Sequence, residues 1–472
     1  MTADAPDDLV AELSALLGEH GLLTEAADRE RYENGWRYGH GVARCVARPT
    51  STAEVAAVVS VCARRGARLI AQGANTGLVA ASTPDGSGAM VVLSLERMHR
   101  TIEVDAAART VLVDGGVTLS QLNEALAPHG LWFPVDLGAD PQVGGMIATN
   151  TGGTRLLKYG DVRHNLLGVE VVLGDGRVLS QLNALRKNNT GLDAKHLFVG
   201  TSGVFGIVTR AVLQVAPLPR QRATALVGCA DGDAVVALLG ALERELGELL
   251  TAFEVMSAAA LEPVFAHQPS VRRPFAELPP YSVLVEVSST LTEDVLPLDG
   301  VLEARLGAFL EVAGEAVVDV VVGRADEFWH LRHLISESLR ASGRMLAFDV
   351  SVPRSRLPAF TAAVHELLAR DYAAIRLCDY GHWGDGGTHL NLVWDGAAFA
   401  QPHQELVAEL QDRIYALAVE GFAGSYSAEH GVGPHNQRCH DRFTAPEVVA
   451  LARHLGQHCD PQRLLGTVRL WP

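Results

Sequence analysis

The sequence predicts a two-domain α+β fold. From about residue 42 onward, short apolar runs of strand length alternate with helical patterns that carry recognisable caps. The 472 residues exceed what one hydrophobic core normally holds. The segment 216–220 carries two prolines, which remove amide donors and can continue neither a helix nor a central strand. We therefore expect one domain over residues 1–220, a second over 221–425, and a final segment, 426–472, that packs back on the first domain.

The elements of the first domain follow from caps and apolar runs. Residues 51–54, Ser-Thr-Ala-Glu, form a capping-box pattern that predicts a helix over 52–65, stopped by Gly66, and then a strand at 67–70. A second capping box begins at Thr118 and predicts another short helix. Further strands are expected at 90–93, 100–104 and 110–114, with a hairpin of 169–173 and 177–179.

The second domain mixes strands with long helices. Its helices are predicted at 326–341 and 404–420. Strands separated by helices of this length favour an antiparallel or mixed sheet covered on one face. The strands are predicted at 223–229, 281–287, 317–321, 346–352 and 388–393.

Composition excludes several classes of protein. A formal charge of −16 without a sustained basic run argues against nucleic-acid binding. The six cysteines lie far apart and form no C-x-x-C pair, which argues against an iron–sulfur site and a disulfide framework. The acidic N-terminal stretch does not have the pattern of a secretory signal, and no apolar run approaches the roughly 18 residues of a membrane span. We expect a cytoplasmic protein whose membrane association, if any, is peripheral.

Two histidine-containing segments indicate a metal site. Residues 382–389, His-Trp-Gly-Asp-Gly-Gly-Thr-His, place two imidazoles seven residues apart across a glycine-rich turn. Residues 427–433, Ser-Ala-Glu-His-Gly-Val-Gly, add the carboxylate of Glu429 and the imidazole of His430. Two histidines and one carboxylate leave open positions on a divalent ion, as in catalytic sites, and His430 is then available for proton transfer. With 18 histidines in the chain, surface or hydrogen-bonded core histidines are the alternative interpretation.

Two glycine-rich loops favour a large flat ligand. Residues 72–78, Gln-Gly-Ala-Asn-Thr-Gly-Leu, follow the strand predicted at 67–70 and could form an anion-binding nest. They match neither a Walker loop nor the G-x-G-x-x-G of a Rossmann fold. Residues 144–153 hold paired glycines and small side chains that permit a close approach of backbone to ligand. Simple tight turns are the alternative interpretation.

Seven motifs occur in one order over nearly the whole chain, at 48–51, 72–78, 143–153, 186–191, 198–209, 382–389 and 427–433. In these segments the chain resembles the FAD-linked D-2-hydroxy acid dehydrogenases, the group that contains D-2-hydroxyglutarate and D-lactate dehydrogenases, within the vanillyl-alcohol-oxidase-like flavoproteins. The resemblance implies a vanillyl-alcohol-oxidase-type FAD-binding domain and an α+β substrate-capping domain with an antiparallel sheet. It also implies FAD held without a covalent bond, and an enzyme that oxidises a D-2-hydroxy acid.

The resemblance further implies the residues that touch the cofactor. The pyrophosphate would lie against the loop at 73–78, and the segment at 144–152 would line the isoalloxazine and ribityl groups. The implied FAD contacts are Pro49, Gln72, Gly73, Ala74, Asn75, Thr76, Gly77, Leu78, Ser82, Pro134, Leu137, Gly138, Gly144, Gly145, Ala148, Thr149, Asn150, Gly152, Gly153, Tyr159, Gly206, Ile207 and Val208.

By the same resemblance, His382, His389 and Glu429 would bind a divalent metal, most often zinc. His430 would be the general base and would contact substrate. Arg332 would bind the substrate carboxylate through its planar guanidinium, although its pattern alone is also that of a helix-surface arginine. Ser336 and Asn391 would complete the substrate contacts.

Departures from the family pattern leave the substrate open. Ala347 stands where D-2-hydroxyglutarate dehydrogenases carry a substrate-contacting lysine, although Arg344 could compensate from nearby. Asn436 stands where lysine is frequent, and Gly387-Thr388 replaces the more usual asparagine–leucine pair. A lactate-like or longer apolar D-2-hydroxy acid therefore competes with 2-hydroxyglutarate as the expected substrate.

Two other functions share this scaffold. One is the non-redox FAD-dependent transfer of the alkyl-glycerone-phosphate synthases, and the other is flavin binding without catalysis. The complete set of His382, His389, Glu429 and His430 favours metal-assisted oxidation over both. The sequence leaves the electron acceptor open among oxygen, a quinone and an electron-transfer flavoprotein, and it leaves the oligomeric state open, a homodimer being compatible with it.

Overall fold

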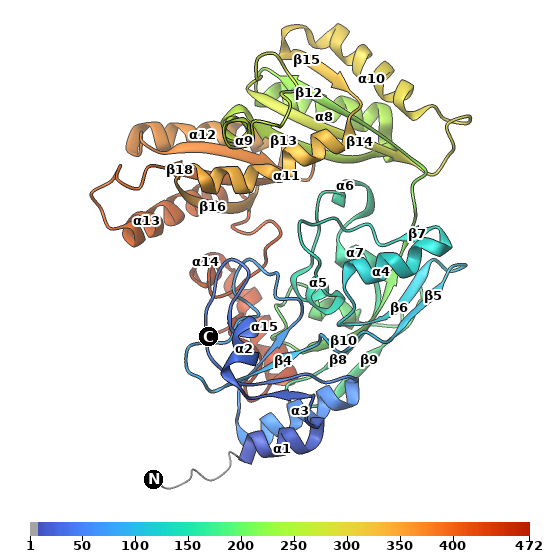
Figure 1. Ribbon diagram of the computed structural model, residues 1–472, viewed down its shortest axis with the longest axis vertical. Coiled ribbons are helices and arrows are strands. Elements are labelled where there is room, and N and C mark those ends of the chain that lie inside the picture. Colours follow the sequence, from blue (N-terminus) through green and yellow to red (C-terminus); the bar gives the residue numbers. More distant parts are fainter. Residues whose placement is uncertain (1–7) are drawn as a thin grey trace. The chain divides into compact units, whose positions relative to one another are not determined.

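The computed structural model describes residues 8–472, which form two compact units (Figure 1). The first unit contains the described residues up to Gly153 together with Gly160–Leu218 and Glu429–Pro472. The second unit contains Thr154–Tyr159 and Pro219–Ala428. Among the described helices, none combines the length and the apolar character that a bilayer crossing requires.

Residues 154–159 depart from the predicted domain limits, because the prediction placed them in the first domain. They contain α6 (Leu156–Tyr159), which packs against β13 (Leu250–Ser257) of the second unit. Lys158 Nζ donates hydrogen bonds to the carbonyl and the hydroxyl of Ser288, at 2.6 and 3.0 Å. These contacts explain why the segment groups with the second unit.

The first unit begins with a mainly parallel four-stranded sheet, in the order β1 (Leu22–Leu23), β2 (Ala43–Ala47), β4 (Met90–Ser94) and β3 (Leu69–Gln72). Helix α3 (Thr52–Arg65) connects β2 to β3 and packs with α1 (Asp8–Leu17) in one hydrophobic core. The Ser51 hydroxyl caps α3 by accepting from the Glu54 amide, and Gly66 ends it in the left-handed region. The helix over 52–65 is therefore confirmed.

A five-stranded antiparallel sheet forms the rest of the first unit's framework. Its order is β5 (Ile102–Asp105), β6 (Thr110–Asp114), β10 (Ile207–Gln214), β8 (Leu166–Val172) and β9 (Val178–Gln181). The β8–β9 pairing confirms the predicted hairpin. Other elements of this unit are α2 (Ala26–Glu33), α4 (Leu119–Leu126), β7 (Leu131–Trp132), α5 (Val143–Thr149), α7 (Val162–Asn165), β11 (Ala216–Pro217), α14 (Gln437–Phe443) and α15 (Pro446–Cys459).

The C-terminal segment is built into this framework. The Leu69 amide donates to the carbonyl of Leu464 at 2.9 Å, and the Gly466 amide donates to the carbonyl of Leu69 at 2.7 Å. Trp471 stacks on Phe205 within the core beneath the antiparallel sheet. Burial of such large aromatic surface fixes the end of the chain to the first unit.

The second unit is organised on a seven-stranded sheet in which every pair is antiparallel. Its order is β15 (Val317–Val322), β12 (Gln221–Cys229), β14 (Tyr281–Ser289), β13, β17 (Arg376–Gly381), β18 (Gly387–Trp394) and β16 (Arg344–Ser351). The helices of this unit besides α6 are α8 (Gly232–Leu246), α9 (Ala258–His267), α10 (Leu298–Ala313), α11 (Ala325–Ala341), α12 (Leu357–Asp371) and α13 (His403–Ala416).

This sheet is covered on both faces, so the expectation of cover on one face was wrong. Helices α9 and α11 share a core with Leu226, Met256 and Leu284 of the central strands. Helices α8 and α10 pack on the same strands, whose residues are buried without alternation. Continuous burial along a strand requires cover on both sides.

One strand and one helix have limits that differ from the predicted ones, and both differences arise at the end of a helix. The strand expected at 67–70 lies at Leu69–Gln72, because the Ala67 amide still donates to the Cys62 carbonyl at the end of α3. The helix expected over 404–420 is α-helical only to Ala416 and continues as a π-turn over Leu417–Gly421.

Candidate active site

The turn between β17 and β18 brings His382 and His389 together. The amides of Asp385 and Gly387 donate to the His382 carbonyl, at 3.0 and 3.2 Å. Gly386 adopts φ +97°, and a Cβ there would lie 2.6 Å from the carbonyl oxygen of Val352, so the turn requires glycine. The two imidazole rings meet edge to face with centroids 5.3 Å apart.

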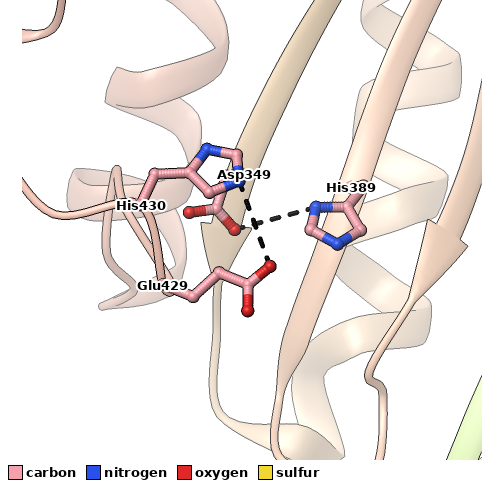
Figure 2. Close-up of side chains that lie close together, drawn as sticks. All are labelled: Asp349, His389, Glu429 and His430. Atoms are coloured by element: carbon pink, nitrogen blue, oxygen red, sulfur yellow. Dashed lines mark ion pairs between the residues drawn. The ribbon is translucent and has the colours of Figure 1, made fainter. Parts of the chain in front are cut away.

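Four side chains form a cluster with ligand atoms all within 4.8 Å of one another, and we call it the carboxylate–histidine cluster. It consists of Asp349, His389, Glu429 and His430, which point toward one another in Figure 2. His389 Nδ1 lies 3.8 Å from Asp349 Oδ1, and His430 Nε2 lies 3.9 Å from Glu429 Oε1. Two imidazoles and two carboxylates are donors that suit zinc and related divalent ions.

Backbone pairing along β16 explains the cluster. Asp349 lies directly opposite His389 in the β16–β18 register, so both side chains project from the same face. Ser351 and Ser425 exchange backbone hydrogen bonds at 3.2 and 2.8 Å, and the Ala428 amide donates to the Asp349 carbonyl at 3.3 Å. Glu429 and His430, which follow Ala428, therefore lie beside Asp349.

His382 lies beside this cluster and is not one of its four members. Its Nδ1 is 2.5 Å from Glu254 Oε1. A ring nitrogen bonded to a carboxylate is the usual state of a metal-binding histidine, because it directs the other nitrogen to the metal. Of the predicted metal ligands, His389 and Glu429 thus belong to the cluster, and His382 could join them only through Nε2.

Glu254 links His382 to Arg332. Its side chain is 1% exposed, and its second oxygen, Oε2, lies 2.9 Å from Arg332 Nε. Burial alone would raise the pKa of this carboxyl, but the charges and hydrogen bonds of His382 and Arg332 outweigh burial and lower the pKa to about 2. Arg332 is 11% exposed and stacks over the Tyr380 ring at 4.5 Å. It is therefore not a solvated arginine of a helix surface.

The other predicted substrate residues occupy the same region of the second unit. Ser336 lies one helical turn after Arg332 on α11 and is partly buried. Asn391 is buried on β18, and its amide donates to the carbonyls of Cys378 and His389, at 3.2 and 3.3 Å. Ala347 pairs with Asn391 across β16 and β18, so it shares a face with Asn391 and His389.

Arg344 does not replace the missing charge at Ala347. Residues of odd and even number project from opposite faces of β16, and Arg344 is therefore on the face away from Ala347, at the exposed beginning of the strand. The site thus contains Arg332 without a second cation on β16.

Asn436, where family members often carry lysine, organises the turn after His430. Its Oδ1 accepts from the Gly433 amide and its Nδ2 donates to the Gly431 carbonyl, both at 2.9 Å. Asn436 is buried, so a charged side chain here would be costly. The substitution therefore has a local structural role.

The predicted flavin loops lie in the first unit, with Tyr159, on α6, as the exception. Gln72 is buried at the end of β3 and donates to the carbonyls of Tyr32 and Ser82, at 2.9 and 2.8 Å. Asn75 adopts φ +56° and accepts from the Ser82 hydroxyl at 2.9 Å. This left-handed residue is held in place by its neighbours, as is frequent at ligand sites.

Two kinds of position occur among the glycines of these loops. Gly153 and Gly206 have positive φ, and a Cβ on either would lie 2.4 Å from a neighbouring atom, so the fold itself requires them. Gly77, Gly138 and Gly145 have neither a positive φ nor any atom within 4 Å of an added Cβ. Neither a left-handed turn nor close packing requires glycine at these three positions, and such positions would permit the close approach of a flat ligand.

Helix α5 has one face buried in the core and one partly exposed face of small residues. Val143, Met146 and Ile147 are buried in the core of the first unit. Gly145, Ala148 and Thr149 occupy the opposite, partly exposed face. This strip of small residues fits the cofactor-binding role that the sequence predicted for it.

We expect Gly145→Ala to weaken FAD binding without lowering the unfolding temperature of the apoprotein. Alanine is the better helix former, and the added methyl group meets no protein atom. Overpacking against a bound ligand costs about 1–3 kcal/mol, which is roughly a 5- to 150-fold change in Kd. Flavin fluorescence titration and thermal melts measure the two effects. Unchanged affinity would place the flavin elsewhere.

His435 is a partly buried histidine of the first unit that the sequence analysis did not single out. It stacks on Tyr38 with ring centroids 3.8 Å apart, and its amide donates to the Val79 carbonyl at 3.2 Å. Burial, with smaller contributions from the charges of Arg37, His430 and Arg438, lowers the pKa of this imidazole to about 4.

This pKa predicts a pH dependence of stability. The unfolded chain takes up a proton near pH 6.5, whereas the folded imidazole does so only near pH 4. Stability is therefore lost as the pH falls from 6.5 to 4 and changes no further below that range. We expect His435→Gln to flatten the melting temperature against pH in this window. An equal slope in both proteins contradicts the assignment.

Comparison with known proteins agrees with this description. The FAD binding domain family matches residues 43–181, and the C-terminal domain of FAD linked oxidases matches residues 218–468. The fold is shared with alkyldihydroxyacetonephosphate synthase, at a TM-score of 0.71 and 16% identity, over 98% of this chain and 87% of that one. Fold and family matches together define an FAD-linked oxidoreductase of the vanillyl-alcohol-oxidase type.

Relatives of higher identity specify the family. The chain is 34% identical to D-2-hydroxyglutarate dehydrogenase of Xanthomonas citri, covering 95% of this chain and 94% of the relative. It is also 34% identical to the mitochondrial D-2-hydroxyglutarate dehydrogenase of Rattus norvegicus, covering 96% of this chain and 82% of the relative. The chain belongs to the FAD-linked D-2-hydroxy acid dehydrogenase family.

Proposed function

We propose that this protein oxidises a D-2-hydroxy acid to the 2-oxo acid, with FAD as hydride acceptor and a divalent metal, preferably zinc, at the carboxylate–histidine cluster. The observation that carries this proposal is the convergence of Asp349, His389, Glu429 and His430, with His382 held alongside by a buried carboxylate. The names of the relatives support the same reaction class.

The metal would be held by His389, Glu429 and the Nε2 of His382, with Asp349 as a further carboxylate in reach. When bound, a divalent ion polarises the substrate hydroxyl and lowers its pKa. His430 would accept the hydroxyl proton, and FAD, when bound by the first unit, would supply the acceptor for the C2 hydride. One proton and one hydride are thus removed, and the 2-oxo acid results.

Arg332 would bind the C1 carboxylate of the substrate. Its ion pair with Glu254 uses Nε, so the terminal end of the guanidinium, with Nη1 and Nη2, is the end that would face a carboxylate. Bidentate contact of this kind fixes orientation as well as charge. Ser336 and Asn391 are proposed as the neighbouring polar contacts.

The FAD would be held non-covalently by the loop after β3, the loop at 134–138, the small face of α5 and the beginning of β10. Gly77, Gly138 and Gly145 support this placement, because an added Cβ at each would meet no protein atom within 4 Å and the backbone is therefore open to a ligand. Pro49 and Tyr159 are proposed contacts on the basis of family resemblance alone. An electron-transfer flavoprotein or a quinone is the proposed acceptor of the flavin electrons, and a cytoplasmic homodimer is the proposed assembly.

Anaerobic reduction of the purified flavoprotein tests the proposed reaction. D- and L-lactate, D- and L-2-hydroxyglutarate, malate and longer 2-hydroxy acids are mixed with the protein before and after chelation, and bleaching of the flavin band is followed. Rapid bleaching by a D-acid that is lost on chelation supports metal-assisted oxidation. No bleaching in metal-replete protein would favour the transferase or a non-catalytic flavin protein.

A further inference from the structure

We propose that Glu254 is a positioning residue, whose single buried carboxylate sets both the metal-binding nitrogen of His382 and the substrate-binding end of Arg332. This inference rests on the proposed function, because it assigns roles to a metal ligand and a substrate contact. It concerns a residue outside the predicted site, on a strand that is itself absent from the sequence-based assignment.

The three side chains come from three separate elements of the second unit. Glu254 lies on β13, next to the residue pair Val255 and Gly381 of the β13–β17 ladder. Continuing that register by one residue places Glu254 opposite His382, where the chain leaves β17. Arg332 reaches the same carboxylate from α11, which covers this face of the sheet.

Each oxygen of Glu254 serves one partner. Oε1 lies 2.5 Å from His382 Nδ1, and Oε2 lies 2.9 Å from Arg332 Nε. Because an ionised carboxylate only accepts hydrogen bonds, the proton of His382 must sit on Nδ1. The lone pair of the imidazole is then on Nε2, the nitrogen that a metal ion requires.

The same carboxylate orients Arg332. Contact through Nε holds the inner edge of the guanidinium, while the Tyr380 ring supports its plane at 4.5 Å. Tyr380 also packs against His389, with centroids 5.4 Å apart. Arg332, His382 and His389 therefore form one packed assembly around Glu254 and Tyr380.

Stability alone does not account for this arrangement. A buried ion pair is often no more stabilising than apolar residues of similar volume, because desolvation offsets the attraction. Here, one fully buried carboxylate accepts hydrogen bonds from two site residues that lie on different elements. Control of their geometry is the function that such a bridge can perform.

The neighbouring strand offers a matched control. Glu286 on β14 is also buried and also contacts α11, where its Oε2 accepts from Trp329 Nε1 at 3.0 Å. Its other oxygen, Oε1, has no hydrogen-bond partner among residues 8–472. Glu286→Gln therefore perturbs a buried glutamate of the same sheet while leaving the proposed bridge intact.

The test compares Glu254→Gln and Glu254→Asp with Glu286→Gln in the full-length, FAD-loaded protein. Zinc affinity is measured on metal-stripped protein by competition with a chelating dye, and kcat and KM are measured with D-lactate and D-2-hydroxyglutarate. A glutamine can accept from only one of the two partners and presents an N–H to the other. Loss of such a supporting contact typically costs about 10- to 100-fold in metal affinity.

We expect that loss in Glu254→Gln together with a raised KM, and values close to wild type in Glu286→Gln. The loss of zinc affinity should disappear in a His382→Ala background, because Glu254 acts on the metal through His382. Glu254→Asp should fall between wild type and Glu254→Gln, since its shorter side chain reaches one partner. Equal zinc affinity in Glu254→Gln and Glu286→Gln would overturn the inference.

Two further outcomes are distinguished. If the wild-type protein neither binds zinc nor is reduced by any D-2-hydroxy acid, the proposed function itself fails. If neither Glu254 variant folds, the nitrogen-15 resonances of His382 in wild-type protein, assigned by their loss in His382→Asn, decide the matter. A proton on Nδ1 supports the inference, and Nδ1 without a proton contradicts it.

Discussion

Replacement of His430 by alanine is expected to lower kcat by about 10²- to 10⁴-fold, the usual contribution of a general base. His430 Nε2 lies within the carboxylate–histidine cluster, 3.9 Å from Glu429 Oε1. An alanine cannot accept the hydroxyl proton as the hydride leaves. The flavin should remain bound and oxidised on anaerobic mixing with a D-2-hydroxy acid, which stopped-flow absorbance measures directly.

The metal content of the variant separates the two possible roles of His430. If His430 acts as base, His430→Ala should retain zinc, because His382, His389 and Glu429 remain. Loss of both zinc and activity would instead make His430 a ligand. His454→Ala is a suitable control, since His454 is an exposed histidine on α15 and its removal should change neither quantity.

The parts of this site that depend on neighbouring residues could be predicted from the sequence. The histidine spacing in residues 382–389 could be interpreted because glycines there leave few alternatives to a tight turn, and the structure closes that turn between two antiparallel strands. Caps likewise predicted α3 and α4, since the Ser51 and Thr118 hydroxyls bond to backbone amides a few residues away. Interactions between residues a few positions apart can therefore be predicted from the sequence.

Asp349 and Glu254 were missed because their roles depend on register and not on spacing. Asp349 reaches His389 only through the β16–β18 pairing, and Glu254 reaches His382 only through β13, 128 residues earlier in the chain. Each is the single acidic residue of an otherwise largely apolar buried strand. A lone carboxylate in such a strand is the signal that could have identified both, because burying it without partners is costly.

We expect substrate choice to depend on the face of β16 that carries Ala347. Ala347, Asn391 and His389 project from one face of the sheet, and Arg344 projects from the other. If Arg332 binds the C1 carboxylate as proposed, a monocarboxylic hydroxy acid would need no further cation. A dicarboxylic acid would bring a second negative charge to a surface where β16 provides no partner.

We therefore expect Ala347→Lys to shift specificity toward D-2-hydroxyglutarate. A hydrogen bond to a charged group contributes about 1.5–3 kcal/mol, which corresponds to roughly a 10- to 150-fold gain in kcat/KM for the dicarboxylate relative to D-lactate. Ala347→Met, of similar reach and without charge, is the matched control and should favour neither dicarboxylate binding nor its turnover. The measurement is kcat/KM for both acids in the three proteins. A wild-type protein that already prefers D-2-hydroxyglutarate strongly, and gains nothing from the lysine, would contradict this prediction. The distal carboxylate would then be bound by residues away from β16, and the absence of charge at Ala347 would not determine the substrate.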